Sequence, residues 1–182
     1  MTPAPPTAAD SPPPIADISQ EVSVSGIHNR LFFRLFQVSN TLDRQTVREL
    51  GITSVQWAVL GALSRPQAAQ GMSFTELADY LMVSRQNLYG VLKRLEREAH
   101  LTRLLDQQDR RVKKVILTPR GRKLWDRLQP KIYEFYRQAM ASFQLDDTVS
   151  LVHYLNSLNK GITAVNLGAT PETTDSSATG TN

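Results

Sequence analysis

The order of local signals between residues 73 and 119 constrains the fold of this chain more than any other feature. Ser73 and Glu76 have the spacing of a capping box, in which each side chain bonds to the other residue's backbone amide, and they predict the start of a helix. Ser84 predicts the start of a second helix after a tight turn near Val83. Two short helices joined by a tight turn are typical of a helix-turn-helix.

An extended hairpin is predicted directly after these helices. Beyond His100 the apolar spacing changes from helical to extended, and residues 101–105 and 112–117 are predicted to be strands joined by a polar, charged loop. Thr118 and Pro119 then have the pattern of a helix start, with threonine as the N-cap and proline at the first position. A hairpin that follows a helix-turn-helix predicts a winged helix-turn-helix domain.

Longer helices are predicted on both sides of this domain. A helix over residues 27–50 has Leu31 and Val38 on one apolar face, which phenylalanines widen, and helices near residues 119–143 and 146–165 follow the hairpin. Wide apolar faces at both ends of a chain favour a core shared between two subunits. The expected fold is mainly α with a small β-hairpin wing, in which N- and C-terminal helices form a helical dimerisation domain.

Composition sets the predicted boundaries of these parts. Residues 1–21 are rich in proline and residues 166–182 in small and polar residues, so both are predicted to be disordered tails. Residues 22–52 and 122–165 are assigned to the helical dimerisation region. Residues 53–121, which open on a second capping box (T-x-x-Q), are assigned to the winged helix-turn-helix.

Positive charge is concentrated in one stretch of the chain. The net charge is +4, but residues 85–123 alone hold 12 basic and 4 acidic side chains. A localised basic patch predicts a polyanionic partner, and nucleic acid is the commonest one. A solvated basic face is the alternative that charge alone leaves open.

Composition also argues against several classes of protein. The chain has no cysteine, and its three histidines, His28, His100 and His153, lack metal-ligand spacing, so no metal or other cofactor is expected. With no paired histidines and no glycine-rich phosphate loop, we expect no catalytic residues and no enzyme. No apolar run is long enough to cross a membrane, and no secretion signal is recognised, so a cytoplasmic protein without a membrane partner is expected.

The exposed face of the second short helix carries side chains that suit DNA. Its predicted DNA-binding residues are Ser84, Arg85, Gln86, Asn87, Tyr89, Lys93 and Arg94. Side chains at the start of a recognition helix reach base edges, where Arg pairs with guanine, and Gln or Asn pairs with adenine. Residues 85–87 are therefore expected to read bases, and Ser84 and Tyr89 to touch phosphates. The alternative is a solvated helix face.

The predicted wing supplies a second set of DNA-binding residues. Asp109 lies two residues before Arg111, so its carboxylate can hold the guanidinium in a fixed direction. An arginine on a thin loop can enter the minor groove, where the negative potential is strongest over A·T tracts. Arg110, Lys113 and Lys114 are then expected along the flanking phosphates. The alternative is that Arg111 is an ordinary surface arginine.

Together these segments resemble the MarR family of winged-helix regulators. The segments that carry the likeness are 51–57 (GITSVQW), 77–79 (LAD), 83–86 (VSRQ), 109–112 (DRRV) and 115–121 (VILTPRG). The wing pattern is fairly specific, whereas the others count through their order and spacing. The resemblance covers about residues 27–165, and the whole sequence looks most like the family's repressors of nicotinic-acid catabolism.

The resemblance implies a homodimeric repressor that binds a pseudo-palindromic operator in double-stranded DNA, with one recognition helix and one wing per half-site. It also implies a small effector, often an aromatic carboxylate, bound between the dimerisation and DNA-binding parts. For the nicotinic-acid subgroup the effector would be a hydroxylated pyridine carboxylate. The absence of cysteine departs from the peroxide-sensing members of the family.

An aromatic acid needs a flat apolar slot and one cation for its carboxylate. His28 or Arg34, near the start of the first long helix, is predicted to supply the cation, with Phe32 beside them. Trp57 on the next helix is predicted to supply the slot. The alternative is that Trp57 belongs to the core and His28 is exposed.

One other class of function stays open at this point, a winged-helix adaptor that binds proteins without sequence-specific DNA binding. The charge density of residues 85–123 argues against it, because a protein-binding wing does not need that density. Nucleic-acid binding with almost no salt dependence would favour it.

Overall fold

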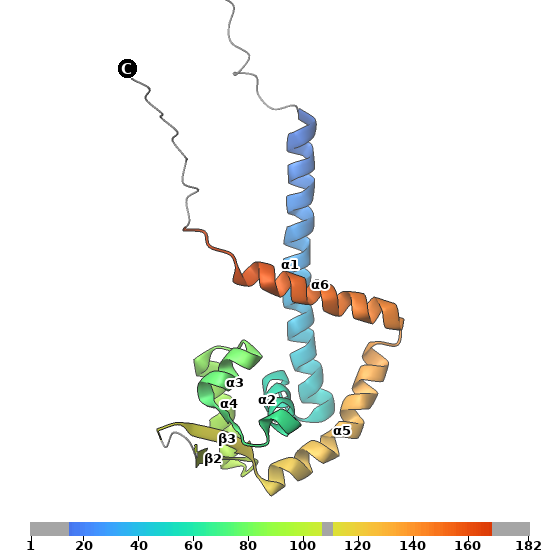
Figure 1. Ribbon diagram of the computed structural model, residues 1–182. Coiled ribbons are helices and arrows are strands. Elements are labelled where there is room, and N and C mark those ends of the chain that lie inside the picture. The colour runs from blue at the N-terminus through green and yellow to red at the C-terminus, as the bar shows by residue number, and fades with distance from the viewer. Residues whose placement is uncertain (1–14, 107–110, 169–182) are drawn as a thin grey trace, which may run out of the picture. The chain divides into compact units, whose positions relative to one another are not determined.

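The computed structural model describes residues 15–106 and 111–168 and divides into two units, of which the first ends at Phe135 and the second begins at Tyr136 (Figure 1). In chain order the elements are α1 (Ile15–Leu50), α2 (Ser54–Ser64), a 3-10 turn (Pro66–Ala68), β1 (Met72–Ser73), α3 (Phe74–Leu81), α4 (Arg85–Arg97), β2 (Leu101–Leu105), β3 (Lys113–Leu117), α5 (Pro119–Ala139) and α6 (Leu145–Thr163). The mainly helical fold with a small β-hairpin wing is therefore confirmed.

The two predicted capping boxes are present and set the starts of α2 and α3. The Thr53 amide donates to Gln56 Oε1 at 2.9 Å, and the Gln56 amide donates to Thr53 Oγ1 at 3.1 Å. At α3 the Ser73 amide donates to Glu76 Oε2 at 2.7 Å, and the Glu76 amide donates to Ser73 Oγ at 3.2 Å. Each box satisfies amides that the first helical turn leaves without an intrahelical partner.

A carboxylate on α1 fixes the joint between α1 and α2. The amide and the hydroxyl of Ser54 both donate to Asp43 Oδ1, at 2.9 and 2.6 Å. The hydroxyl bond, followed by the amide bond, lowers the pKa of Asp43. Thr46, one turn further along α1, is fully buried and donates to the Asp43 carbonyl at 3.0 Å. The last turns of α1 are therefore anchored to the winged-helix domain.

The sheet has three antiparallel strands in the order β1-β3-β2. The hairpin was predicted, with Leu101 opposite Leu117, but β1 was not, because two residues show no readable alternation. Gly71 explains how the chain enters β1. Its φ is +81°, and an added Cβ would lie 2.8 Å from the carbonyl oxygen of Val115 on β3, so only glycine fits this approach.

The core of the first unit lies between α2, α3, α4 and the sheet. Its largest fully buried apolar side chains are Val59, Leu60, Leu77, Leu88, Leu92, Leu95 and Val115. Trp125 of α5 closes the same core at Gly61 on α2, where an added Cβ would lie 3.1 Å from the indole ring. This packing fixes which face of α4 is turned inward.

The first helix begins earlier than the sequence predicted. We expected helix from residue 27 and a disordered tail over residues 1–21, but α1 starts at Ile15, so residues 15–21 are helical. The reason is local, because Pro14 is the last proline before Pro66, so no proline interrupts the helix over residues 15–50. Residues 1–14 and 169–182 of the predicted tails lie outside the described residues.

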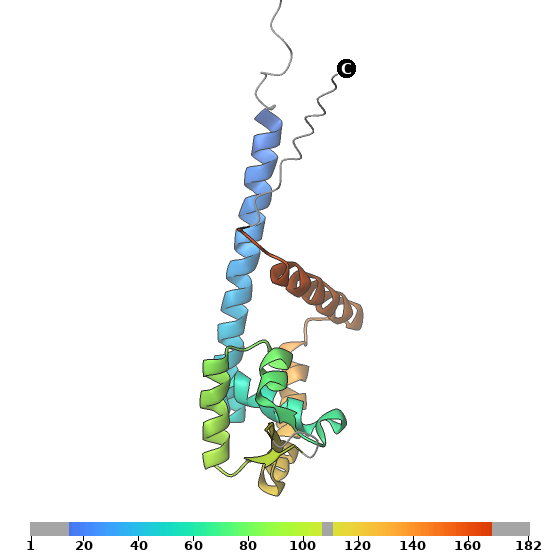
Figure 2. The same cartoon turned by 60° about the vertical axis from the view of Figure 1, so that its left-hand side comes forward.

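The apolar face of α1 is not covered within its own unit. Leu31 is 44% exposed and Val38 64%, and the phenylalanines that widen the face are exposed as well. Both views of the structure show α1 extending well past the winged-helix domain (Figure 2). In the second unit α6 has no buried residue among those described, although Leu151, Leu155 and Ile162 lie along it. No described helix is long and apolar enough to span a membrane.

Candidate nucleic-acid interface

The outward face of α4 is the surface that the fold leaves for a partner. Leu88, Leu92 and Leu95 are buried, and they orient the helix against the core. The exposed residues that follow one another along the opposite side are Gln86, Gly90, Lys93 and Arg97. Ser84 caps the helix as predicted, since its hydroxyl oxygen accepts from the Asn87 amide at 3.2 Å.

Two predicted DNA-binding residues of α4 are held by neighbours in the subunit. Arg85 donates to Thr75 Oγ1 at 3.3 Å, and its guanidinium carbon lies 5.7 Å from the centre of the Phe74 ring. Arg94 donates through Nε to Glu98 at 3.1 Å on the next turn. Both side chains remain exposed, so these contacts orient the cations without removing them from the surface. Ser84, Gln86, Asn87, Tyr89 and Lys93 are also exposed.

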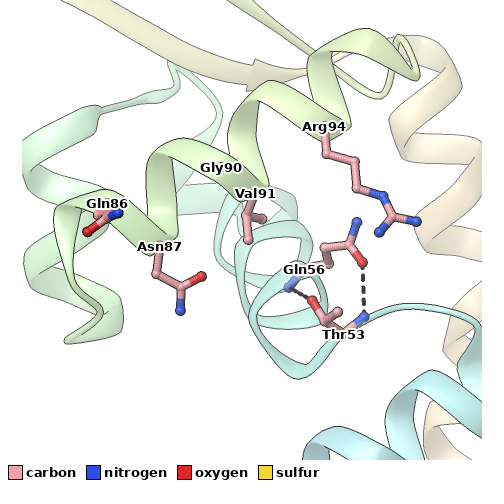
Figure 3. A pocket seen from close by; sticks show the side chains of 7 residues that line it. All are labelled: Thr53, Gln56, Gln86, Asn87, Gly90, Val91 and Arg94. Atoms are coloured by element: carbon pink, nitrogen blue, oxygen red, sulfur yellow. Dashed lines mark hydrogen bonds between the residues drawn. The ribbon is translucent and has the colours of Figure 1, made fainter.

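A groove of about 280 Å³ runs between α4 and the start of α2. Its lining residues are Thr53, Gln56, Gln86, Asn87, Gly90, Val91 and Arg94 (Figure 3). Gln56 is only 3% exposed, and its Oε1 accepts from the Thr53 amide, so its side-chain nitrogen must point the other way. Figure 3 shows that nitrogen on the side of α4. The α2 side of the groove therefore offers the Gln56 nitrogen as a hydrogen-bond donor.

The wing is described only in part. Asp109 and Arg110 lie outside the described residues, so the predicted support of Arg111 by Asp109 remains a prediction. Arg111 and Lys113 are both exposed at the end of the hairpin. They remain predicted phosphate and minor-groove residues.

Lys114 does not follow the prediction that placed it along the phosphates. Its Nζ lies 2.5 Å from Oδ2 of Asp106, and this ion pair raises the pKa of Lys114. Successive side chains of a strand point to opposite faces, so Lys113 and Lys114 cannot both face the same partner. The alternation was readable in the sequence and should have separated the two lysines.

Lys114 also lies beside the start of α3, since it pairs across β1 and β3 with Ser73, the N-cap of that helix. Two hydrogen bonds from Ser73 lower the pKa of Glu76 at the start of α3, and the charge of Lys114 lowers it further. Lys114 therefore lies between two carboxylates, one on the hairpin and one on α3. The ion pair with Asp106 joins the two arms of the hairpin.

Salt bridges inside the basic stretch of residues 85–123 neutralise its described acidic side chains, so the cations left over dominate its surface charge. Glu96 accepts from Arg103 at 2.6 Å, and Glu98 and Asp106 are the acidic partners already described. Every described acid between residues 85 and 123 is thus paired with a cation of the same stretch. Lys93 and Arg97 on the outward face of α4 are exposed.

A second basic cluster at the start of α5 was not predicted. Arg120, Lys123 and Arg127 line a shallow hollow with Asp126. Burial, followed by the charge of Arg120, lowers the pKa of the neighbouring His100. The helical spacing of three and four residues was visible in the sequence and places these cations on one face.

The structure does not bring the predicted effector residues together within one chain. His28, Phe32 and Arg34 are exposed on α1, where Arg34 donates to Gln37 at 2.9 Å, whereas Trp57 packs against the core of the domain. At 1.5 Å per residue, His28 lies about 22 Å along α1 from the joint at which α2 begins. Among the described residues, no group of three His, Asp or Glu could hold a metal ion.

Comparison with known sequences supports the reading of this domain. The family model that matches residues 50–112 is described as the MarR family. BadR, a transcriptional activatory protein of Rhodopseudomonas palustris, is 46% identical over 149 residues, which are 80% of this chain and 85% of BadR. The homoprotocatechuate degradative operon repressor of Escherichia coli is 31% identical over 132 residues, 71% of this chain and 87% of the repressor.

Solved structures have the same fold. One is the structure of BpsR from Bordetella bronchiseptica, whose DNA binding is described as regulated by 6-hydroxynicotinic acid. It aligns with a TM-score of 0.59 and 26% identity, and covers 72% of this chain and 97% of that one.

Proposed function

The chain belongs to the MarR family of winged-helix transcriptional regulators, which are not enzymes, and we propose that it works as a homodimer on a pseudo-palindromic operator. The observation that carries the proposal is the outward face of α4. It is exposed, it carries Gln86, Lys93 and Arg97, and its opposite side is locked into the core by three leucines. A helix held in this way can enter a major groove without losing its packing.

Individual roles on the DNA follow from position on the domain. Gln86 and Asn87 at the start of α4 are proposed to read base edges, and Arg85 reads a guanine from its place beside Thr75. The residues proposed to contact phosphates are Ser84, Tyr89, Lys93, Arg94, Arg110 and Lys113. Arg111, supported by Asp109, is proposed to enter the minor groove at each wing.

The uncovered apolar faces of α1 and α6 support a homodimer. Leu31 and Val38 on α1, and Leu155 and Ile162 on α6, are all exposed in the single chain. Large apolar faces left in water are typical of protein interfaces. Residues 22–52 and 122–165 are therefore proposed as the dimerisation region, and the dimer sets the spacing of the two recognition helices.

The effector is proposed to be a small aromatic carboxylate. Two relatives support this class, since one is named for homoprotocatechuate degradation and another for regulation by 6-hydroxynicotinic acid. Trp57 would supply the slot, and Phe32 with His28 or Arg34 the rest of the site. Because α1 holds His28 far from Trp57 in one chain, we propose that the partner subunit's α1 completes the site. Hydroxynicotinate is the first compound to test.

We propose repression as the direction of control, as the name of the Escherichia coli relative suggests. Activation is the second candidate, because BadR, at 46% identity, is named an activatory protein. A reporter gene under the chain's own promoter separates the two. Deleting the regulator raises expression if it represses and lowers expression if it activates.

The proposed function is tested by binding to the promoter DNA beside the chain's own gene at physiological salt. Fluorescence anisotropy should show much tighter binding to that promoter than to random duplex of equal length, and an aromatic acid should change the affinity. Equal affinity for both DNAs, with almost no dependence on salt, would contradict the proposal and support the protein-binding adaptor.

A further inference from the structure

A glycine stands at the centre of the outward face of α4. Gln86, Gly90, Lys93 and Arg97 follow one another at intervals of four, three and four residues, and all four are exposed. A Cβ added at Gly90 would meet no atom of the protein within 4 Å. Its φ does not lie in the left-handed region, where glycine is favoured. Neither packing nor backbone conformation within the subunit therefore requires glycine here.

Glycine in the middle of a helix has a cost. It destabilises the helix by about 0.5–1 kcal/mol relative to alanine, because the unfolded chain has more freedom to lose. Within the subunit, alanine at this position would make α4 more stable than glycine does. A bare backbone on an exposed helix face is explained if a partner comes close to it.

The missing side chain also opens the groove between α4 and α2. Gly90 and Val91 form its α4 side, and Asn87 and Arg94 lie one turn to either side of them (Figure 3). The Gln56 amide nitrogen faces it from α2. A side chain at position 90 would project from the rim of this groove, toward whatever enters.

We propose that Gly90 is a close-approach position for DNA, at which base-pair edges of the operator lie against the bare backbone of α4. The inference rests on the proposed function and adds a residue that neither charge nor hydrogen-bonding capacity singles out. DNA is favoured as the occupant over a small acid because Lys93 and Arg97 follow the glycine along the same exposed face, where a polyanion gains from both. The groove beside Gly90 then accommodates part of one strand.

Two substitutions test the proposal on the full-length protein, Gly90→Ala and Gly90→Leu. Both residues are strong helix formers, so the melting temperature should stay constant or rise. Affinity for the promoter that the wild type binds should fall about tenfold for alanine, a loss typical of one disturbed contact, and further for leucine. A rise in stability with a fall in DNA affinity is a combination that a purely structural residue does not give.

Gly26→Ala is the matched control. Gly26 lies in α1, and an added Cβ there also meets no atom of the same chain within 4 Å, so this variant controls for the gain in helix stability. Gln67→Leu controls for DNA affinity and should keep that of the wild type, because Gln67 is exposed in the 3-10 turn, outside both α4 and the proposed dimerisation region. Wild-type affinity in Gly90→Leu would overturn the inference alone. The inference also fails if Gly90→Leu keeps its DNA affinity and loses its response to aromatic acids, because the groove then belongs to the effector. A wild type without preference for its promoter overturns both this inference and the proposed function.

Discussion

Gly121, at the junction between the wing and α5, shows how much a single residue can decide. Its amide donates to Thr118 Oγ1 at 3.0 Å, and Thr118 in turn donates through its backbone to the His100 carbonyl at 3.0 Å. A Cβ at Gly121 would lie 2.0 Å from that same carbonyl oxygen. The glycine therefore lets the first turn of α5 close directly onto the strand that begins the wing.

Gly121→Ala should destabilise the domain strongly. The backbone of either the hairpin or α5 must move to admit the methyl group, and overpacking of this kind costs about 1–3 kcal/mol. Urea unfolding followed by circular dichroism measures the change, with Gly26→Ala as the control that has open space. A Gly121→Ala variant as stable as the wild type would contradict the close approach.

The bond between Asp43 and Ser54 should give a stability that depends on pH. The folded pKa of Asp43 is lowered, so its contribution is fully present above the unfolded pKa and is lost as pH falls through the folded value. Ser54→Ala should therefore cost about 1 kcal/mol at pH 7, and the difference from wild type should shrink as the pH approaches 3. Urea unfolding at several pH values measures it. A difference that does not change with pH would mean that the carboxylate is not involved.

At the scale of elements, the sequence was most informative where structure is set locally. The starts of α2, α3, α4 and α5 were predicted because each depends on a side chain and an amide three residues away. β1 was not predictable, because its two residues are extended only through pairing with β3, some 40 residues further along the chain. Strand alternation could have separated Lys114 from Lys113, but the ion pair of Lys114 with Asp106 became visible only in the structure.

The wing offers a test with two adjacent lysines. If Lys113 contacts a phosphate directly, Lys113→Ala should reduce the slope of log affinity against log salt by about 1. Lys114→Ala should leave that slope almost unchanged and should instead weaken binding by loosening the wing, because Lys114 is paired with Asp106. Equal slopes for the two variants would contradict the separate roles. Circular dichroism checks that both variants remain folded.

At the scale of the whole molecule, a single chain leaves too much apolar surface in water. Local signals predicted the helices of both units, but they could not say what covers the faces of α1 and α6, which we propose to be a second chain. The proposed effector site also depends on a second chain. His28 and Trp57 are far apart in one subunit, so the effector site proposed from the sequence requires the proposed second subunit.

Leu31→Asp tests this assembly. A carboxylate in an apolar interface is strongly unfavourable, so the variant should become monomeric, as measured by sedimentation velocity. The winged-helix domain should keep its fold, because Leu31 is 44% exposed and lies about 18 Å along α1 from Asp43. DNA affinity should fall by two orders of magnitude or more, because each monomer binds one half-site without the linked second contact. Gln67→Asp, at an exposed position outside the proposed dimerisation region, should remain dimeric, and a dimeric Leu31→Asp would contradict the proposed interface.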